Sequence, residues 1–128
     1  MAKVPSPIPV DEKLPATRRI MALAKKLQLA EVELSTHYGD PSLKVQGKAF
    51  ATVKEAGILV LHCPLDMKEL LMEMAPAIYY QTDHYKGWPG LLLRLDAIDD
   101  EELGLRLEDA WRFKAPKALA AARPTARS

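Results

Sequence analysis

The chain has 128 residues, of which 48% are hydrophobic and 27% are charged, and its formal net charge is +1. This length corresponds to one domain, because domains contain about 100–200 residues. The composition is that of an ordinary globular protein, and it excludes disordered, collagen-like and coiled-coil chains. The nearly neutral charge means that any binding of nucleic acid requires a local basic patch.

The cysteine content and the apolar runs indicate the compartment in which the protein is expected. Cys63 is the single cysteine and lies in an apolar stretch, which is typical of a small buried hydrophobic side chain rather than a nucleophile. The segment from Met1 to Val10 has no continuous apolar core, so it is not a secretory signal. The longest clean apolar run, Ile58 to Leu61, is far shorter than the roughly 20 residues that span a bilayer. We therefore expect a cytoplasmic protein with no membrane contact.

The N-terminal part of the chain changes character at Pro15. Prolines 5, 7 and 9 stand among small residues, and proline cannot donate a backbone hydrogen bond, so we expect a flexible arm over residues 1–14. Proline is favoured at the first position of a helix. Apolar residues at helical spacing follow and predict a helix over residues 15–29. These apolar residues are Ile20, Leu23, Ala24 and Leu27.

Four segments after this helix have the pattern of strands. Apolar and polar residues alternate in the first segments, and the last segment is apolar on both faces, as in a central strand. The expected strands are residues 31–36, 42–46, 49–54 and 58–63. Gly47 with Lys48 predicts a tight turn between two of them.

A second helix follows the apolar strand. Pro64 opens this helix and Pro76 ends it, and Asp66 with Glu69 has the spacing of a capping box. Its expected apolar face consists of Met67, Leu70, Leu71 and Met74.

Two further strands and a third helix complete the expected elements. The strands are residues 78–82 and 90–95, and the helix covers residues 99–114. Asp99 and Glu102 repeat the capping-box spacing at the start of that helix. Helices that are grouped around antiparallel hairpins, rather than alternating with strands, predict an α+β fold. The whole order is a helix, three or four strands, a helix, two strands and a helix.

Three parts of the chain resemble a known family in both order and spacing. They are residues 37–45 followed by 47–51, residues 82–89 leading into 92–95, and residues 108–112 with 115–117. Together they resemble the MmcQ/YjbR family of small bacterial proteins over about residues 16–119. The resemblance implies a two-layer α+β fold of the order α-β(3)-α-β(2)-α, with an antiparallel sheet and helices on one face. The domain would cover residues 15–119, followed by a basic tail over 120–128.

The resemblance also suggests a function. The family is often labelled DNA-binding and described as a double-wing arrangement, and it has no established catalytic residues to transfer. We expect DNA to be bound, without catalysis, by basic side chains on the hairpins and on the C-terminal helix. Such side chains contact phosphates, which give affinity rather than sequence preference. The expected phosphate contacts are Lys44, Lys48, Lys86, Arg94, Arg112, Lys114 and Lys117.

The segment from Asp83 to Pro89 is the strongest candidate for a functional loop. Asp83, His84, Tyr85 and Trp88 crowd into it, and loops held between strands often carry function. His84 is a candidate for acid–base work, because histidine is the side chain whose charge ordinarily changes near neutrality. A structural interpretation stays open, in which the aromatic side chains pack the loop onto the body of the protein and His84 forms a structural hydrogen bond.

Other kinds of site find less support in the sequence. No two of His37, His62 and His84 have the short spacing of a zinc site, so we expect neither a metal nor a cofactor. The chain has no nucleophile elbow and no glycine-rich phosphate loop, so we expect no enzyme activity. The alternative to DNA binding is a dimeric module that binds a protein or a small ligand.

The fold that is expected here resembles that of secretion chaperones, which dimerise, although a fold alone says little about function. The candidate patch for a homodimer consists of Tyr79, Tyr80 and Leu92.

Overall fold

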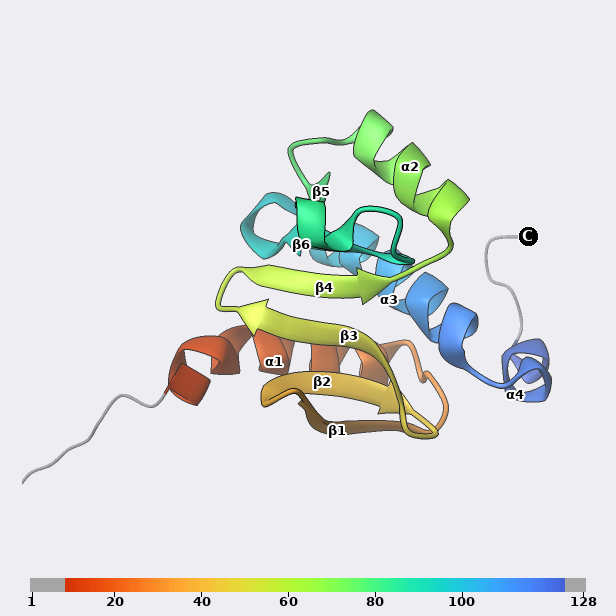
Figure 1. Ribbon diagram of the computed structural model, residues 1–128. Coiled ribbons are helices and arrows are strands. Elements are labelled where there is room, and N and C mark those ends of the chain that lie inside the picture. The colour runs from red at the N-terminus through yellow and green to blue at the C-terminus, as the bar shows by residue number, and fades with distance from the viewer. Residues whose placement is uncertain (1–8, 124–128) are drawn as a thin grey trace, which may run out of the picture.

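The computed structural model describes the backbone of residues 9–123 and the side chains from residue 12 onward. Six strands form one sheet in the order β1-β2-β3-β4-β6-β5, and every neighbouring pair is antiparallel. Figure 1 shows this sheet with its helices. The strands are β1 (Val32–His37), β2 (Asp40–Val45), β3 (Lys48–Glu55), β4 (Ile58–His62), β5 (Tyr79–Tyr80) and β6 (Gly90–Arg94). The helices are α1 (Pro9–Lys26), α2 (Leu65–Met74), α3 (Asp100–Lys114) and α4 (Lys117–Ala122).

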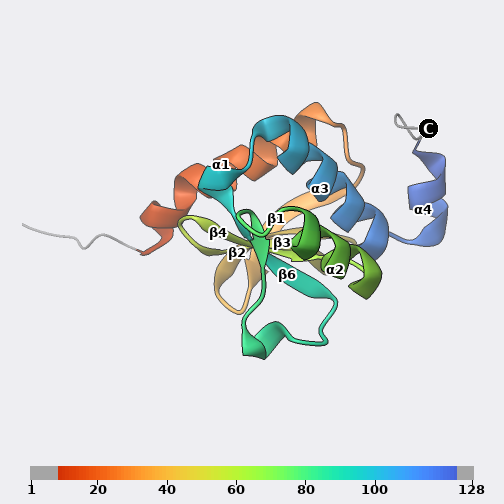
Figure 2. The same cartoon turned by 90° about the horizontal axis from the view of Figure 1, so that it is seen from above.

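The expected α+β class with helices against one face of an antiparallel sheet is confirmed. Viewed from above, α1 and α3 lie on one side of the sheet, and the segment between β5 and β6 projects from the other side (Figure 2). Four strands rather than three stand between α1 and α2, within the range that the strand patterns allow. None of the helices in residues 9–123 is long and apolar enough to cross a membrane.

The hydrophobic core lies between the sheet and the two helices. Alternate residues of a strand point to opposite faces, so β4 sends Leu59 and Leu61 into the core and Val60 and His62 to the opposite face. Trp111 of α3 is completely buried, and its indole N–H donates to the carbonyl of Ala30 at 2.9 Å. We call the face that α1 and α3 leave uncovered the open face.

Two tight hairpin turns connect the first three strands. Tyr38 and Gly39 join β1 to β2 with φ values of 51° and 85°, and Gln46 with Gly47 joins β2 to β3 with φ values of 48° and 81°. Two central residues with positive φ are typical of a type I′ turn, which matches the twist of antiparallel strands. The second turn therefore uses Gln46 and Gly47 rather than Gly47 and Lys48.

The N-terminal helix begins at Pro9 rather than at Pro15, so residues 9–14 are helical and are not part of an extended arm. Residues 1–8 of the expected arm lie outside the described residues. Pro15 lies inside α1, where it removes one backbone hydrogen-bond donor from the helix. Side-chain contacts of Lys13 and Thr17 stabilise this part of the helix. The Lys13 ammonium pairs with the Asp40 carboxylate, and the Thr17 hydroxyl donates to the Lys13 carbonyl at 2.8 Å.

The C-terminal end of the expected domain also differs, because α4 crosses the boundary at residue 119. Arg123 donates to the carbonyl of Leu27 at 2.8 Å and to the Glu108 carboxylate at 3.1 Å. These bonds attach the segment after α3 to the end of α1. Residues 124–128 of the expected basic tail lie outside the described residues.

The two expected capping boxes have different outcomes. The Asp99 carboxylate accepts a hydrogen bond from the backbone N–H of Glu102 at 2.8 Å, so the cap of α3 is confirmed. The cap of α2 is wrong, because Pro64 stands at the N-cap and Asp66 accepts from its neighbour, the N–H of Met67.

The expected apolar face of α2 is confirmed in part, because Leu71 is buried and Met67 packs against the core. Leu70 and Met74 are 53% and 71% exposed, whereas Leu71 and Lys68 are buried. The helix is turned so that Lys68 and Leu71 are buried, while Met67 and Met72 pack against the core at its sides.

Candidate functional site

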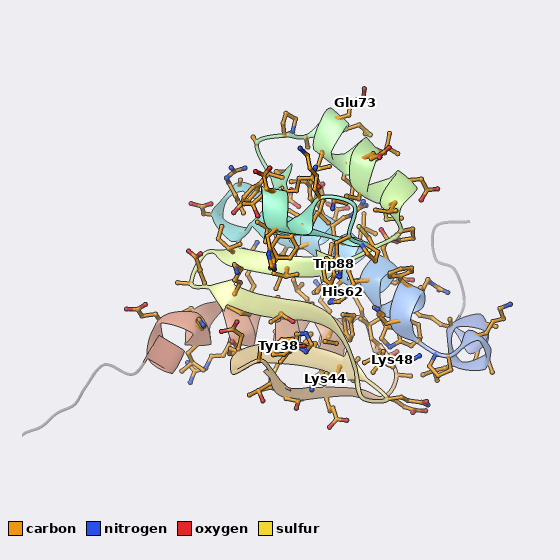
Figure 3. All side chains as sticks on the ribbon, viewed as in Figure 1. Tyr38, Lys44, Lys48, His62, Glu73 and Trp88 are labelled. Carbon is orange, nitrogen blue, oxygen red and sulfur yellow. The ribbon has the colours of Figure 1, made fainter. Side chains whose placement is uncertain are left out.

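A pocket of about 400 Å³ lies on the open face of the sheet. The side chains that line it come from the turn between β1 and β2, from β3 and β4, and from the segment between β5 and β6. They are His37, Tyr38, Asp40, Thr52, Lys54, Val60, His62, His84, Tyr85 and Trp88. In Figure 3, Tyr38, His62 and Trp88 lie in front of the sheet, on its open face, and the helices α1 and α3 lie behind it.

The floor of the pocket consists of neighbouring positions in the sheet. Thr52 of β3 and Val60 of β4 are paired in register, and His62 lies two residues beyond Val60. All three are buried although no helix covers them. The Thr52 hydroxyl is 2.9 Å from the hydroxyl of Ser42, so the floor is also linked to β2.

One wall is the segment between β5 and β6, residues 81–89, which we call the aromatic loop. The Lys68 ammonium of α2 donates to the carbonyls of Tyr85 at 2.6 Å and of Trp88 at 2.8 Å. The Lys68 side chain is only 2% exposed, and burial lowers its pKa from the ordinary value. A buried ammonium with two carbonyl acceptors fixes the loop against α2, because losing either partner would leave a buried polar group unpaired.

Trp88 is held over the floor by close packing. Its ring makes edge contacts with His62, at 4.9 Å between ring centres, and with Tyr85, at 5.5 Å. A Cβ atom on Gly90 would lie 2.1 Å from the Trp88 ring, so only glycine fits there. Gly90 therefore leaves the space that the indole ring occupies, and 38% of Trp88 remains exposed.

The opposite wall is the turn between β1 and β2. Tyr38 occupies the first central position of this turn with a φ of 51°, and its side chain is 94% exposed. A large residue with positive φ is uncommon, and backbone strain tends to gather at functional sites. The His37 ring lies at 4.6 Å from the Tyr38 ring and faces the pocket beside it.

Two neighbouring titratable groups, His62 on the floor of the pocket and Cys63 in the core, have shifted pKa values. Burial, with smaller effects from the charges of Lys114 and His37, lowers the pKa of His62 from 6.5 to about 4. His62 is therefore neutral near pH 7, and its buried Nδ1 has no hydrogen-bond partner among the described residues. Cys63 next to it is buried, as expected, and burial raises the pKa of its thiol to about 11.

All three histidines of the chain line this one pocket, although they are far apart in the sequence. Within the described part of the chain, however, no three His, Cys, Asp or Glu side chains are placed to hold a metal ion.

The expected loop residues divide between the pocket and the solvent. His84, Tyr85 and Trp88 line the pocket, whereas the Asp83 carboxylate is fully exposed and does not. Asp83, His84 and Tyr85 form a short 3-10 helix within the aromatic loop. The aromatic loop therefore contributes His84, Tyr85 and Trp88 to the pocket. Tyr85 and Trp88 also pack the loop onto the body of the protein, as the structural interpretation expected.

The sequence did not single out several residues of the site. Tyr38, Lys54 and His62 line the pocket, and Lys68 of α2 fixes the aromatic loop by its hydrogen bonds to the loop carbonyls. The only local signal was the position of Tyr38 before a glycine between two expected strands. Nothing local distinguishes Lys68 from the other lysines of a surface helix.

The basic residues that we expected to contact DNA fall into two groups. Lys48, Lys86 and Lys117 are exposed, and Lys44 and Lys114 are partly exposed. Arg94 and Arg112 are instead engaged within the fold. The Arg94 guanidinium lies 4.0 Å from the centre of the Tyr80 ring and donates to the carbonyls of Pro76 and Ala77 at 3.3 Å.

Arg112 attaches α4 to the body of the protein. It donates to the Glu108 carboxylate at 3.1 Å and to the carbonyls of Ala120 and Arg123. Burial favours a higher pKa for Glu108, but the hydrogen bonds from Arg123 and Arg112 outweigh it, and the net pKa is lowered. Arg112 therefore stabilises the fold.

The expected apolar patch for a homodimer is wrong. Tyr79 and Leu92 are 1% and 2% exposed, and the Tyr79 hydroxyl donates to the Glu102 carboxylate at 2.6 Å. Burial, followed by this hydrogen bond, raises the pKa of Tyr79. Tyr80 is partly covered by Arg94, so these residues do not form an exposed surface.

Comparison with known proteins places the chain in a family. The YjbR family model matches residues 27–113, which include every residue that lines the pocket. Two mycobacterial proteins are 29% identical over 104 residues, which cover 80% of this chain and 71% of theirs. They are the uncharacterized protein Mb2600 of Mycobacterium bovis and the uncharacterized protein Rv2570 of Mycobacterium tuberculosis. No solved structure matches the chain. The chain belongs to the YjbR family, as the three segments of its sequence indicated.

Proposed function

We propose that this protein binds DNA without catalysis and that the open face of the sheet is the binding surface. One observation carries the proposal: Lys54 lines the pocket, Lys86 lies in the aromatic loop that walls it, and the charge of Lys114, at the end of α3, reaches the floor at His62. Together with Lys44 of β2, which alternates with the core residues Leu43 and Val45, we call these side chains the open-face lysines. Phosphate groups are the natural partners of such side chains, and phosphate contacts supply most of the affinity for nucleic acid.

The charges around these lysines favour an anionic partner. Within residues 12–123, Lys44, Lys54 and Lys114 form no ion pair, and Lys86 has only a 4.0 Å contact with the exposed Asp83. Glu33 lies opposite Lys44 in the register of β1 and β2, so Lys44 should contribute least. Lys54, Lys86 and Lys114 are therefore the main candidates for phosphate contacts.

The shifted pKa values support a role without catalysis. A general base works best when its pKa lies near the working pH. His62, with a pKa of about 4, is a weak base, and the Cys63 thiol, with a pKa of about 11, stays protonated. Neither is suited to proton transfer or nucleophilic attack near pH 7.

The test is a titration of a labelled random DNA duplex, followed by fluorescence anisotropy at two salt concentrations. Phosphate binding makes the logarithm of the affinity fall with the logarithm of the salt concentration, by about 0.9 for each phosphate neutralised. The combined change Lys54→Ala, Lys86→Ala and Lys114→Ala should weaken binding and reduce this slope by about 2 to 3.

A matched control removes the same charge from the other side of the molecule. Arg18, Lys25 and Lys26 are exposed on α1, which covers the opposite face of the sheet, and their combined change to alanine should leave the slope intact. Absence of binding at low salt contradicts the proposal. Equal losses in the two triple variants contradict the assignment to the open face, because they indicate a dependence on net charge alone.

A further inference from the structure

We infer that the pocket on the open face binds a single nucleotide, with the base against the aromatic side chains and the phosphate toward Lys54. The nucleotide is either free or an unpaired residue of a nucleic acid strand, and the second case rests on the proposed function. The inference adds a small-ligand site to a surface that otherwise needs only phosphate contacts.

The size of the pocket limits what can enter. Its volume of about 400 Å³ lies within the range of roughly 300–1,000 Å³ that small-ligand sites occupy. A base that is paired and stacked inside a duplex cannot enter such a pocket, whereas an unpaired base can be turned out into it. The pocket therefore selects single nucleotides over duplex DNA.

The aromatic walls favour a planar ligand. Trp88 is 38% exposed and Tyr38 is 94% exposed, and both line the pocket whose floor contains Val60. Trp88 is also held in place, because Lys68 fixes its backbone carbonyl and Gly90 accepts its ring. A base stacks well on an aromatic ring that is already ordered, since no side-chain entropy is then lost.

The charge of the pocket favours an anion. The Lys54 ammonium lies 5.8 Å from the centre of the Tyr85 ring, directly beside the space that a base would occupy. The pocket contains one carboxylate, Asp40, and the Lys13 ammonium neutralises it. The charge of Lys114 also reaches the floor at His62. A phosphate group matches this excess of positive charge.

The floor offers hydrogen bonding to the edge of a base. His62 Nδ1 is buried and has no hydrogen-bond partner within the described chain. Buried polar atoms nearly always have a partner, so such an atom at the floor of a pocket is suited to a bound molecule. A neutral imidazole has both a donor and an acceptor nitrogen, as the edge of a base requires.

The experiment measures binding of three probes by tryptophan fluorescence and calorimetry: deoxyadenosine 5′-monophosphate, deoxyadenosine and inorganic phosphate. The monophosphate should bind more tightly than either of the other two, because each of them lacks one half of the interaction. Trp88→Ala should weaken its binding at least about 5-fold, and Trp88→Phe should restore part of the loss. Lys54→Ala should weaken binding of the monophosphate and leave that of deoxyadenosine unchanged.

Phe113→Ala is the matched control for Trp88, because Phe113 is also 38% exposed and lies outside the pocket. It should leave the affinity for the monophosphate unchanged. Since Trp88→Ala also removes packing, the exposed Lys54 provides the variant whose fold is not at risk. If neither Trp88→Ala nor Lys54→Ala changes binding, or if the monophosphate does not bind, the inference is wrong.

A second pair of probes identifies the source of the nucleotide. Single-stranded oligodeoxyadenylate and its duplex with oligothymidylate are compared at one salt concentration. Tighter binding of the single strand, lost in Trp88→Ala, assigns the pocket to an unpaired residue of DNA. Equal binding of both, together with binding of the monophosphate, assigns it to a free nucleotide. Salt-dependent duplex binding that Trp88→Ala does not alter, together with no binding of the monophosphate, leaves the proposed function standing and refutes this inference alone.

Discussion

The two faces of the sheet use the same strands for different purposes. On the face under α1 and α3, β4 contributes Leu59 and Leu61, which are at most 1% exposed and pack among other apolar side chains. On the open face the same strand contributes Val60 and His62, which are buried by a loop rather than by a helix. Burial on the first face depends on many apolar contacts, whereas burial on the second depends on how one lysine, Lys68, holds the aromatic loop.

The largest effect should come from the core under the helices. Trp111→Ala should reduce the free energy of unfolding by about 3–5 kcal/mol, because it leaves a cavity and removes the donor to the Ala30 carbonyl. Urea denaturation followed by circular dichroism measures the loss.

Val60→Ala provides the comparison on the open face. Its loss should be less than half that of Trp111→Ala, because the loop over Val60 can settle into the space. Equal losses would show that the open face is packed as firmly as the core.

The core face could be predicted from the sequence because it depends on periodicity. Alternating strands and the helical spacing around Trp111 follow from which residues avoid water, and the Asp99 cap follows from a local pattern. Such signals lie within one element, so they do not require knowledge of which elements meet.

The candidate site could be predicted only in part, for the opposite reason. The aromatic loop was found because its residues are adjacent in the sequence. Its partners Tyr38, His62 and Lys68 come from a turn, a strand and a helix, and only the tertiary fold brings them together. The position of Lys68 on the buried side of α2 contradicts helical amphipathicity, and only the two loop carbonyls explain it.

The second-largest effect should be a dependence of the free energy of unfolding on pH, which arises from His62 on the open face. The pKa of His62 is about 4 in the folded protein and 6.5 in its ordinary state, so the unfolded chain binds the proton first as the pH falls. The free energy of unfolding should therefore decrease between about pH 6.5 and pH 4, by up to about 3 kcal/mol. Urea denaturation at several pH values above about 4.5 measures it, because the lowered pKa of Glu108 adds its own loss at lower pH.

His62→Phe keeps a ring against Trp88 and should flatten this pH dependence. His84→Phe changes an exposed histidine of the same pocket and should leave it unaltered. A pH profile that survives His62→Phe would assign the effect to another group.

A third, smaller effect concerns the ring of Trp88. Gly90→Ala places a Cβ atom where the ring now lies, so Trp88 must move, at a cost of about 1–3 kcal/mol. The tryptophan emission should shift to longer wavelength as the ring becomes more exposed, and binding of the monophosphate should weaken. Gly57→Ala is the control, because a Cβ atom there has no neighbour within 4 Å. Unchanged emission in Gly90→Ala would mean that the loop accommodates the methyl group without moving Trp88.

The smallest effect separates stability from binding at a single residue. Asparagine is preferred over tyrosine at a position with positive φ in a type I′ turn, and the Tyr38 side chain is 94% exposed, so little packing is lost. Tyr38→Asn should therefore stabilise the protein by about 0.5–1 kcal/mol while weakening binding of the monophosphate. Gln46→Asn makes the equivalent change in the other turn, where φ is 48°, and should stabilise the protein without affecting binding, because Gln46 lies outside the pocket. A stabilised Tyr38→Asn variant with full affinity would show that the tyrosine is not part of the binding surface. A stabilised variant with reduced affinity would show that Tyr38 contributes to binding although it is unfavourable for the stability of the turn.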